Sequence, residues 1–287
     1  MKTVKDAYNE FKGNLAHIYS IPETDAITSL VLNDLTGLSK ARIKAFTDTE
    51  LTIEQSQRLS IILKELKTGK PVQYILGHTE FYGLNFLVNS TVLIPRPETE
   101  ELVEWILRTI PPSSNLNILD IGTGSGCIPI ILKSHLINNK LFAIDISLDA
   151  LQTAKRNAEL NNVEITFVEA NALNLNHPVI AGQQYGVIVS NPPYVTLVDK
   201  KQMHYNVTGF EPHTALFVPD ESPLLFYIAI ADFAAGHLIN NGYLFFEINE
   251  SYGPETVDML TSKGFTQIEL RQDMAGKDRM IKAVLAR

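Results

Sequence analysis

The stretch that most constrains the fold is an apolar strand that leads straight into glycines and then into an apolar helical pattern, at residues 117–130. Glycine permits a tight turn and close approach of the backbone to a ligand, and the first helical turn leaves N–H groups free. The dinucleotide-binding fingerprint requires Gly-x-Gly-x-x-Gly. Here Gly122, Gly124 and Gly126 alternate, and Cys127 stands where the third glycine of the fingerprint would fall. The spacing disfavours a nicotinamide or flavin enzyme.

An acid ends the next strand of this unit. Asp145 closes the apolar run at 141–146 and lies nineteen residues beyond Gly126. An acid at the end of the second strand is placed to accept hydrogen bonds from ribose hydroxyls. This feature is shared by sites for dinucleotides and for S-adenosylmethionine, so it does not separate them. The alternative is that Asp145 caps the helix that begins near Ser147.

A stiff turn that is rich in hydrogen-bond acceptors follows a later strand. Its residues are Asn191, Pro192, Pro193 and Tyr194. Both prolines fix φ and lack an N–H, while the Asn191 side-chain oxygen can accept one N–H of a planar NH2 group. The alternative is a Pro-rich turn that only ends the strand. Together with the glycine loop and Asp145, this turn favours a methyltransferase that acts on an amide or amine nitrogen.

Strand and helix patterns alternate from residue 98 onward, which predicts a mostly parallel sheet with helices on both faces. Strands are predicted near 116–121, 141–146, 165–169, 186–190, 242–248, 265–270 and 279–285. Helices are predicted near 98–109, 126–137, 148–161, 222–240 and 253–263. The short connection at 271–277 predicts that the last strand turns back. Because ligands bind outside the carboxyl ends of such strands, Gly122, Asp145 and Asn191 are expected at one rim.

The part of the chain before this region has a different pattern. Residues 1–70 carry apolar side chains at helical spacing, which predicts a small helical bundle. Residues 71–97 predict a β-hairpin linker to a catalytic domain at 98–287. The bundle either packs on the catalytic domain or helps to hold a protein substrate, and the sequence leaves both open. Residues 195–221 form a long irregular stretch, which is expected to wall a substrate pocket.

Several stretches, distributed over nearly the whole chain, form a recognisable set. They are residues 71–77, 80–83, 93–100, 120–126, 190–194, 211–212 with 215–216, and 273–279. In these stretches the chain resembles the HemK/PrmC family, which methylates the glutamine side-chain amide of class 1 peptide chain release factors. Asn-Pro-Pro-Tyr alone also occurs in amino-methyltransferases that act on adenine in DNA. The segment that ends at Glu100, together with the linker, is much more specific.

The resemblance implies a class I, Rossmann-like methyltransferase with a seven-stranded, mostly parallel sheet whose seventh strand is reversed. It implies methyl transfer from S-adenosyl-L-methionine, which becomes S-adenosyl-L-homocysteine, to N5 of the glutamine in the Gly-Gly-Gln motif, in support of translation termination. The cofactor-binding residues are then expected to be Gly122, Thr123, Gly124, Ser125, Gly126, Asp145, Asn171, Ala172 and Asn191. The expected catalytic residues are Asn191, Pro192 and Tyr194. Substrate contacts are expected from Asn191, Pro192, Pro193, Tyr194, Arg96, Glu98 and Glu211.

Two of these expectations have alternatives or departures. For the segment with Arg96, Glu98 and Glu100, the alternative is the chemistry of a helix N-terminus, with Pro97 in the first turn and the acids near the positive end of the helix dipole. After the third strand, relatives often carry an acid that accepts the adenine amino group, whereas here Asn171 holds that place. Its oxygen still accepts a hydrogen bond, without charge. Ala172 is smaller than the residue in some relatives, which predicts a looser adenine pocket.

Charge and composition limit the other functions. The formal net charge is -8 at pH 7, and no basic run exceeds Lys200-Lys201, so a nucleic-acid amine methyltransferase is disfavoured and no direct DNA binding is expected. A non-catalytic binding module is the third alternative, against which the intact Asn-Pro-Pro-Tyr turn argues.

The single cysteine, the absence of a signal-peptide core and of a membrane-spanning run predict a cytoplasmic protein. The histidine spacing predicts no metal site, and a monomer is expected.

Overall fold

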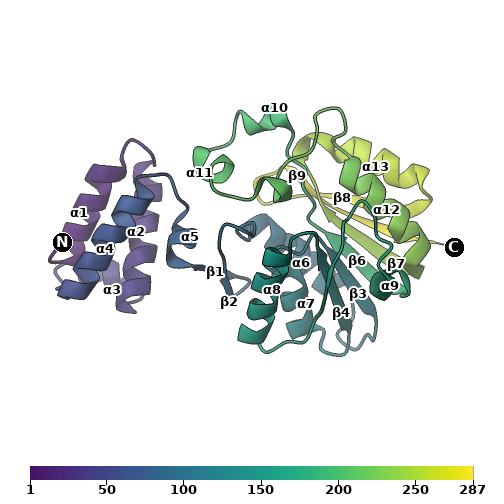
Figure 1. The fold of residues 1–287 in the computed structure, drawn as a ribbon, viewed down its shortest axis with the longest axis horizontal. Coiled ribbons are helices and arrows are strands. Elements are labelled where there is room, and N and C mark those ends of the chain that lie inside the picture. The colour runs from purple at the N-terminus through teal and green to yellow at the C-terminus, as the bar shows by residue number, and fades with distance from the viewer. Residues whose placement is uncertain (287) are drawn as a thin grey trace. The chain divides into compact units, whose positions relative to one another are not determined.

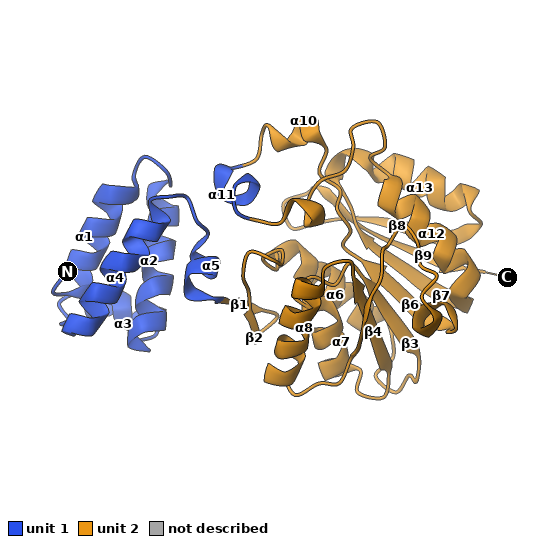
Figure 2. Cartoon of the chain, viewed as in Figure 1, with its two compact units in different colours: residues 1–77, 204–210 blue, residues 78–203, 211–287 orange. Residues whose placement is uncertain are grey.

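The computed structural model describes residues 1–286, which form two compact units (Figure 2). The first unit contains Met1–Gly77 together with His204–Phe210, and the second contains His78–Met203 and the chain from Glu211 onward. The N-terminal helices therefore form one unit with a segment that comes from far along the sequence. None of the helices in the described part of the chain is both long and apolar enough to cross a membrane.

The first unit is a helical bundle, as predicted (Figure 1). Its helices are α1 (Val4–Leu15), α2 (Ile21–Thr36), α3 (Lys40–Ala45), α4 (Ile53–Leu66) and α5 (Val72–Leu76). Each of the first four begins after a serine or threonine whose side chain accepts a backbone N–H of the first turn, and these residues are Thr3, Ser20, Ser39 and Thr52. The apolar faces of the helices form a core of their own.

The linker differs from its prediction in one respect. The sequence predicted a hairpin over 71–97, but α5 occupies its first part, because Pro71 precedes that helix and Gly77 ends it at φ 84°. The hairpin itself consists of β1 (His78–Phe81) and β2 (Leu84–Leu87), which pair antiparallel.

The second unit is built on a seven-stranded sheet in the order β5-β4-β3-β6-β7-β9-β8. The strands are β3 (Asn117–Ile121), β4 (Lys140–Asp145), β5 (Thr166–Glu169), β6 (Tyr185–Ser190), β7 (Leu238–Glu247), β8 (Phe265–Gln272) and β9 (Asp278–Leu285). The first five of that order pair in parallel, and β9 lies between β7 and β8, antiparallel to both. The predicted fold class and reversed last strand are confirmed.

Helices cover both faces of this sheet (Figure 1). The α-helices of this unit are α6 (Pro97–Thr109), α7 (Cys127–His135), α8 (Leu148–Leu160), α9 (Pro178–Ala181), α10 (Leu197–Lys200), α12 (Leu225–His237) and α13 (Gly253–Ser262), and two 3-10 helices accompany them, η1 (His213–Ala215) and η2 (Glu250–Tyr252). One core cluster joins one face to α6, α7 and α8, and a second joins the other face to α12 and α13. Helix α12 ends at His237, three residues before the predicted end at 240, because β7 already begins at Leu238.

The long stretch at 195–221 contains short helices that the sequence did not predict. One of them, α11 (Tyr205–Thr208), belongs to the first unit, where a Cβ on Gly69 would lie 3.1 Å from Cδ1 of Tyr205. In the same unit the ring of Tyr19 stacks on His204 with 6.1 Å between centroids. Helices of one turn carry too few residues to show a periodicity, so the sequence pattern could not reveal them.

The parallel register brings three chain segments to one rim. Ile121 at the end of β3 pairs with Ile144 of β4 and with Ser190 of β6. The Ser190 hydroxyl also donates a hydrogen bond of 2.6 Å to the Ile121 carbonyl, which ties the two strand ends together. The glycine loop, Asp145 and Asn191 follow these ends directly, so their expected placement at one rim is confirmed.

Asn157 of α8 links three elements beside this rim and is fully buried. Its side chain accepts a hydrogen bond from the Leu87 amide and donates to the carbonyls of Leu87 and Ser125. One side chain therefore connects the hairpin, α8 and the glycine loop. Because a buried amide side chain is stabilising only when its groups are bonded, this arrangement fixes the position of β2 against the loop.

Gly126 has a packing role in the same region. It begins α7 at φ 80°, and a Cβ there would lie 3.1 Å from Cβ of Ala154 and 3.2 Å from Cδ1 of Ile130. Both the backbone conformation and the close contact with α8 require glycine.

We expect Gly126→Ala to lower the free energy of unfolding of the second unit by about 1–3 kcal/mol, because it adds strain and overpacks the α7–α8 contact. Gly236→Ala is the matched control, since Gly236 lies within α12 and a Cβ there meets nothing within 4 Å. It should stabilise the unit by up to about 1 kcal/mol through helix propensity. Urea unfolding followed by fluorescence of Trp105, the single tryptophan, measures both. Equal effects of the two substitutions would contradict the packing role.

Candidate active site

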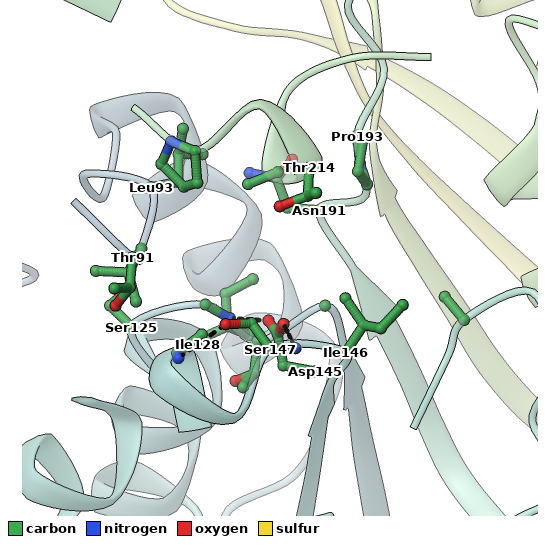
Figure 3. A pocket seen from close by; sticks show the side chains of 18 of the residues that line it. Thr91, Leu93, Ser125, Ile128, Asp145, Ile146, Ser147, Asn191, Pro193 and Thr214 are labelled. Atoms are coloured by element: carbon green, nitrogen blue, oxygen red, sulfur yellow. Dashed lines mark hydrogen bonds between the residues drawn. The ribbon is translucent and has the colours of Figure 1, made fainter. Parts of the chain in front are cut away.

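A cavity of about 360 Å³ opens at this rim of the sheet (Figure 3). Asp145, Ile146 and Ser147 lie on one side of it, and Asn191, Pro193 and Thr214 lie on another (Figure 3). Ten of the residues that the sequence predicted for the site line this cavity. They are Arg96, Gly122, Thr123, Gly124, Ser125, Asp145, Asn171, Ala172, Asn191 and Pro193.

Five other predicted residues are not part of this lining. They are Glu98, Gly126, Pro192, Tyr194 and Glu211, none of which is among the described residues that line the cavity. Glu98 lies in the first turn of α6, and the Tyr194 ring packs against the hydrophobic core. Their contacts with a substrate or cofactor remain predictions.

Asp145 fixes the glycine loop through a hydrogen bond from the loop backbone. Gly122 and Gly124 have φ of 77° and 55°, and a Cβ on either would meet no atom within 4 Å, so a side chain there would occupy the cavity itself. The Asp145 carboxylate accepts the Gly124 amide at 2.9 Å and the Ser147 amide at 2.9 Å. Ser147, whose hydroxyl accepts the Ala150 amide, caps α8, so Asp145 is not the helix cap. Burial raises the pKa of Asp145, and the bonds from Ser147 and Gly124 oppose this shift.

Asn171 and Ala172 form another part of the lining. The Asn171 side-chain oxygen accepts the Leu173 amide at 2.9 Å, which leaves one lone pair for a further donor. Ala172 packs against the core cluster beneath the sheet edge. An uncharged acceptor therefore stands at the place where the sequence predicted one.

An ion pair between the half-buried Arg96 and the buried Glu211 joins two walls of the cavity. The Glu211 carboxylate, 4% exposed, accepts hydrogen bonds from the Arg96 guanidinium and, at 3.2 Å, from the Ile94 amide. Pro212, which follows Glu211, and Arg96 both line the cavity. Because the guanidinium and the carboxylate compensate each other, the pair holds the segment before α6 against the loop after α11 without leaving an isolated buried charge.

Asn191 is connected to a buried carboxylate through a hydroxyl. Its amide nitrogen donates to the Thr99 oxygen at 3.3 Å, and the Thr99 hydroxyl donates to Glu247 at 2.6 Å. The Tyr194 hydroxyl donates to the second oxygen of Glu247 at 3.0 Å. The Tyr194 backbone carbonyl also accepts a bond from the Asn249 side chain at 3.0 Å. The end of β7 therefore holds the Asn-Pro-Pro-Tyr turn at two points.

Sequence reasoning did not identify Thr99 or Glu247 as site residues. Thr99 and Glu247 lie 148 residues apart, and Tyr194 precedes Glu247 by 53 residues, so no local spacing relates the three residues. A signal existed nonetheless: Glu247 is a charged residue at the end of an apolar strand, and it is 1% exposed. Burial raises the pKa of Glu247, while the hydroxyls of Thr99 and Tyr194 and the charge of Arg279 oppose that shift.

Arg279 is the second residue of β9, directly after the turn that joins β8 to β9. It donates to the Asp273 carboxylate at 3.3 Å and to the Ile248 carbonyl at 3.2 Å. Asp273 in turn accepts the backbone amides of Ala275 and Lys277. This side-chain network closes the hairpin and fixes the guanidinium, whose charge acts on Glu247.

Asp120 is a second buried acid that sequence reasoning missed. It belongs to β3, is 0% exposed, and neither carboxylate oxygen has a hydrogen-bond partner among the described residues. Burial raises its pKa to about 7. A buried, unpartnered carboxyl directly before the glycine loop makes Asp120 a candidate site residue, because buried polar groups without a partner are rare at structural positions.

A doubly wound parallel sheet with a reversed last strand, a glycine loop after the first strand and a cavity outside the carboxyl ends defines a class I methyltransferase. Two family models match the chain in agreement with this class. Residues 6–77 match the PrmC N-terminal domain, and residues 101–209 match the methyltransferase small domain.

Relatives match over nearly the full length. A release factor glutamine methyltransferase of Flavobacterium psychrophilum is 46% identical, over 97% of this chain and 98% of its own. A protein of the same name from Bacteroides thetaiotaomicron is 41% identical, over 94% of this chain and 96% of its own. The chain therefore belongs to the release factor glutamine methyltransferase family, and it is a methyltransferase.

Solved structures agree on the fold. A methyltransferase from Pyrococcus furiosus has a TM-score of 0.50 and 16% identity, over 82% of this chain and 100% of its own. A 16S rRNA methyltransferase from Thermus thermophilus, solved with AdoMet and guanosine, has a TM-score of 0.51 and 16% identity, over 73% of this chain and 50% of its own.

The raised pKa of Asp120 predicts a pH-dependent stability. Between pH about 4 and about 7 the folded protein keeps the Asp120 proton that the unfolded chain releases, so this group lowers stability as pH rises. Asp120→Asn removes the effect. The free energy of unfolding of the variant, minus that of the wild type, should therefore rise with pH across this window, by at most about 1.4 kcal/mol per pH unit, and level off above pH 7. Urea unfolding at several pH values, followed by Trp105 fluorescence, measures the difference.

Asp273→Asn is the control for that experiment. The backbone bond from Lys277, the largest cause, lowers the pKa of Asp273, so the carboxyl is ionised in both the folded and the unfolded state above pH 5. Its difference from the wild type should be constant between pH 5 and 7. A constant difference for Asp120→Asn as well would show that Asp120 is already ionised in the folded protein at pH 5.

Proposed function

We propose that this protein transfers the methyl group of S-adenosyl-L-methionine to N5 of the glutamine in the Gly-Gly-Gln motif of class 1 peptide chain release factors. The observation that carries the proposal is the state of Asn191. Its amide nitrogen is bonded to Thr99, while no described residue donates to its side-chain oxygen, which belongs to a residue that lines the cavity. The relatives named release factor glutamine methyltransferases support a glutamine amide as the group that this oxygen accepts.

The cavity suits S-adenosylmethionine. The space that a Cβ on Gly122 or Gly124 would fill is open to a ligand, and Asp145 retains carboxylate lone pairs for ribose hydroxyls. Asn171 offers an uncharged acceptor for the adenine amino group. When bound, S-adenosylmethionine supplies an electrophilic methyl group on a sulfonium.

The Asn-Pro-Pro-Tyr turn would orient the nucleophile. The glutamine nitrogen is a weak nucleophile because its lone pair is delocalised into the carbonyl. The Asn191 oxygen and the Pro192 carbonyl, to which no described residue donates, would accept its two N–H bonds. Two acceptors fix the direction of the nitrogen and stabilise the positive charge that develops on it, so positioning and electrostatics provide the acceleration. No strong general base is required before transfer, because the proton becomes acidic only as the C–N bond forms.

The proposal is tested by transfer of labelled methyl from S-adenosylmethionine to a purified class 1 release factor. A factor with the glutamine of Gly-Gly-Gln replaced, and duplex DNA, serve as parallel acceptors. Label on the intact factor alone is the expected result. Label on DNA alone would replace the proposal by nucleic-acid methylation, and label on no acceptor would contradict it.

Asn191→Ala should lower the rate of methyl transfer by on the order of 10²-fold or more, because it removes one preorganised acceptor. Binding of S-adenosylhomocysteine, measured by calorimetry, should change much less. Asn161→Ala is the control: this residue ends α8, and its amide donates to the backbone carbonyls of Asn85 and Asn157. Near-normal transfer by Asn191→Ala would refute the mechanism.

A further inference from the structure

We propose that Thr99 and Glu247 are positioning residues that determine which end of the Asn191 amide faces the cavity, and thereby select a carboxamide over a carboxylate side chain. The inference rests on the proposed function, because it concerns how the same site recognises glutamine. It assigns a role to two buried residues that do not themselves bind the reacting atoms.

The direction of the hydrogen bonds follows from what each group can donate. The Thr99 hydroxyl donates its single proton to Glu247, at 2.6 Å. The Thr99 oxygen then has only lone pairs to offer Asn191. The amide must therefore turn its NH2 group toward Thr99, at 3.3 Å, and its oxygen away from it.

The surroundings of Glu247 hold this carboxylate in one orientation. The Tyr194 hydroxyl donates to its other oxygen at 3.0 Å, and the side chain is 1% exposed, so water does not compete for either position. The Tyr227 hydroxyl donates to the Glu247 backbone carbonyl at 3.3 Å, which fixes the main chain behind it. Each carboxylate oxygen of Glu247 thus accepts a hydrogen bond, and rotation of the carboxylate would break both bonds.

The hydrogen bonds from Glu247 through Thr99 to Asn191 start from regular secondary structure. Thr99 lies in the first turn of α6 and is 3% exposed, and Glu247 is the last residue of β7. The hydroxyl between them is therefore supplied by regular structure instead of a mobile loop. Positions on helices and strands hold a site more precisely than loops do.

The orientation of Asn191 has a chemical consequence. With its oxygen toward the cavity, the turn presents acceptors, which suit the NH2 of a glutamine and repel the carboxylate of a glutamate. With the amide reversed, Asn191 would present donors, which suit a carboxylate and oppose the NH2. A site that makes specific hydrogen bonds discriminates strongly against a group that cannot form them. Thr99, which itself lines the cavity, and Glu247 would set this preference through Asn191.

The decisive variants change the direction of the hydrogen bond between Thr99 and Asn191 and keep the side chains close to their original size. Thr99→Val replaces the hydroxyl by a methyl group, so that Asn191 has no partner that fixes its orientation. Glu247→Gln can donate to Thr99, which allows the Thr99 hydroxyl to donate to Asn191 and reverses its amide. Thr99→Ser keeps the hydroxyl and is the conservative rescue. Thr256→Val is the matched control, because Thr256 is a buried threonine of α13 that donates to the carbonyl of Tyr252, the residue before this helix, and it does not line the cavity.

Three quantities are measured for each variant: kcat with intact release factor, the Kd for S-adenosylhomocysteine, and the ratio of Kd values for factors that carry glutamine or glutamate in Gly-Gly-Gln. Thr99→Val and Glu247→Gln should lower kcat by about 10- to 100-fold, the value of a hydrogen bond to a charged group, and should lower the preference for glutamine by a similar factor. Cofactor affinity should stay within about threefold, because neither variant alters the glycine loop or Asp145. Thr99→Ser and Thr256→Val should resemble the wild type.

The result that would overturn the inference is an unchanged glutamine preference in Thr99→Val, whatever its kcat, because a merely structural role weakens both ligands equally. Failure of the proposed function is distinct: the wild type would then transfer no label to the factor. In that case the orientation is decided by NMR exchange of the Asn191 side-chain NH2 protons, assigned by their absence in Asn191→Asp. Slower exchange in the wild type than in Thr99→Val supports the fixed orientation, and equal exchange refutes it.

Discussion

The parallel register of three strands is the constraint on which the site depends. Because Ile121 pairs with both Ile144 and Ser190, the ends of β3, β4 and β6 lie side by side. The glycine loop, Asp145 and Asn191 each lie at one of these ends. Strand pairing therefore brings three segments that are distant in sequence to one cavity. The hydroxyl bond from Ser190 to Ile121 then locks the spacing between the loop and the turn.

Sequence reasoning succeeded where the signal was local. Alternating strand and helix patterns predicted the sheet, its helices and the reversed last strand, and the rule for strand ends predicted the rim. It failed where the structure depends on contacts between distant residues. Nothing near Thr99 indicates Glu247, nothing near Asn157 indicates a link to Leu87, and the single turn of α11 has no periodicity to detect.

Glu247 and Asp120 are both buried acids, yet their hydrogen-bond partners differ, so burial alone does not determine what each carboxyl does. Glu247 and Asp120 are both almost inaccessible to solvent, and burial raises the pKa of each. Glu247 has a hydroxyl donor on each oxygen, so its charge is compensated and its orientation is fixed. Asp120 has no partner among the described residues. The first acid can therefore transmit direction to Asn191, whereas the second contributes a proton equilibrium beneath the glycine loop.

In the proposed function, the Asn-Pro-Pro-Tyr turn recognises an NH2 group and not the molecule that carries it. An acceptor pair would serve an amide of a protein or an exocyclic amine of a base equally well, so the turn alone does not decide the substrate. The choice must come from the walls around it. Here those walls include the segment joined by Arg96 and Glu211, in a chain of net charge -8. A negative net charge opposes a phosphate backbone, which favours a protein over a nucleic acid as the carrier of the NH2 group in the proposed function.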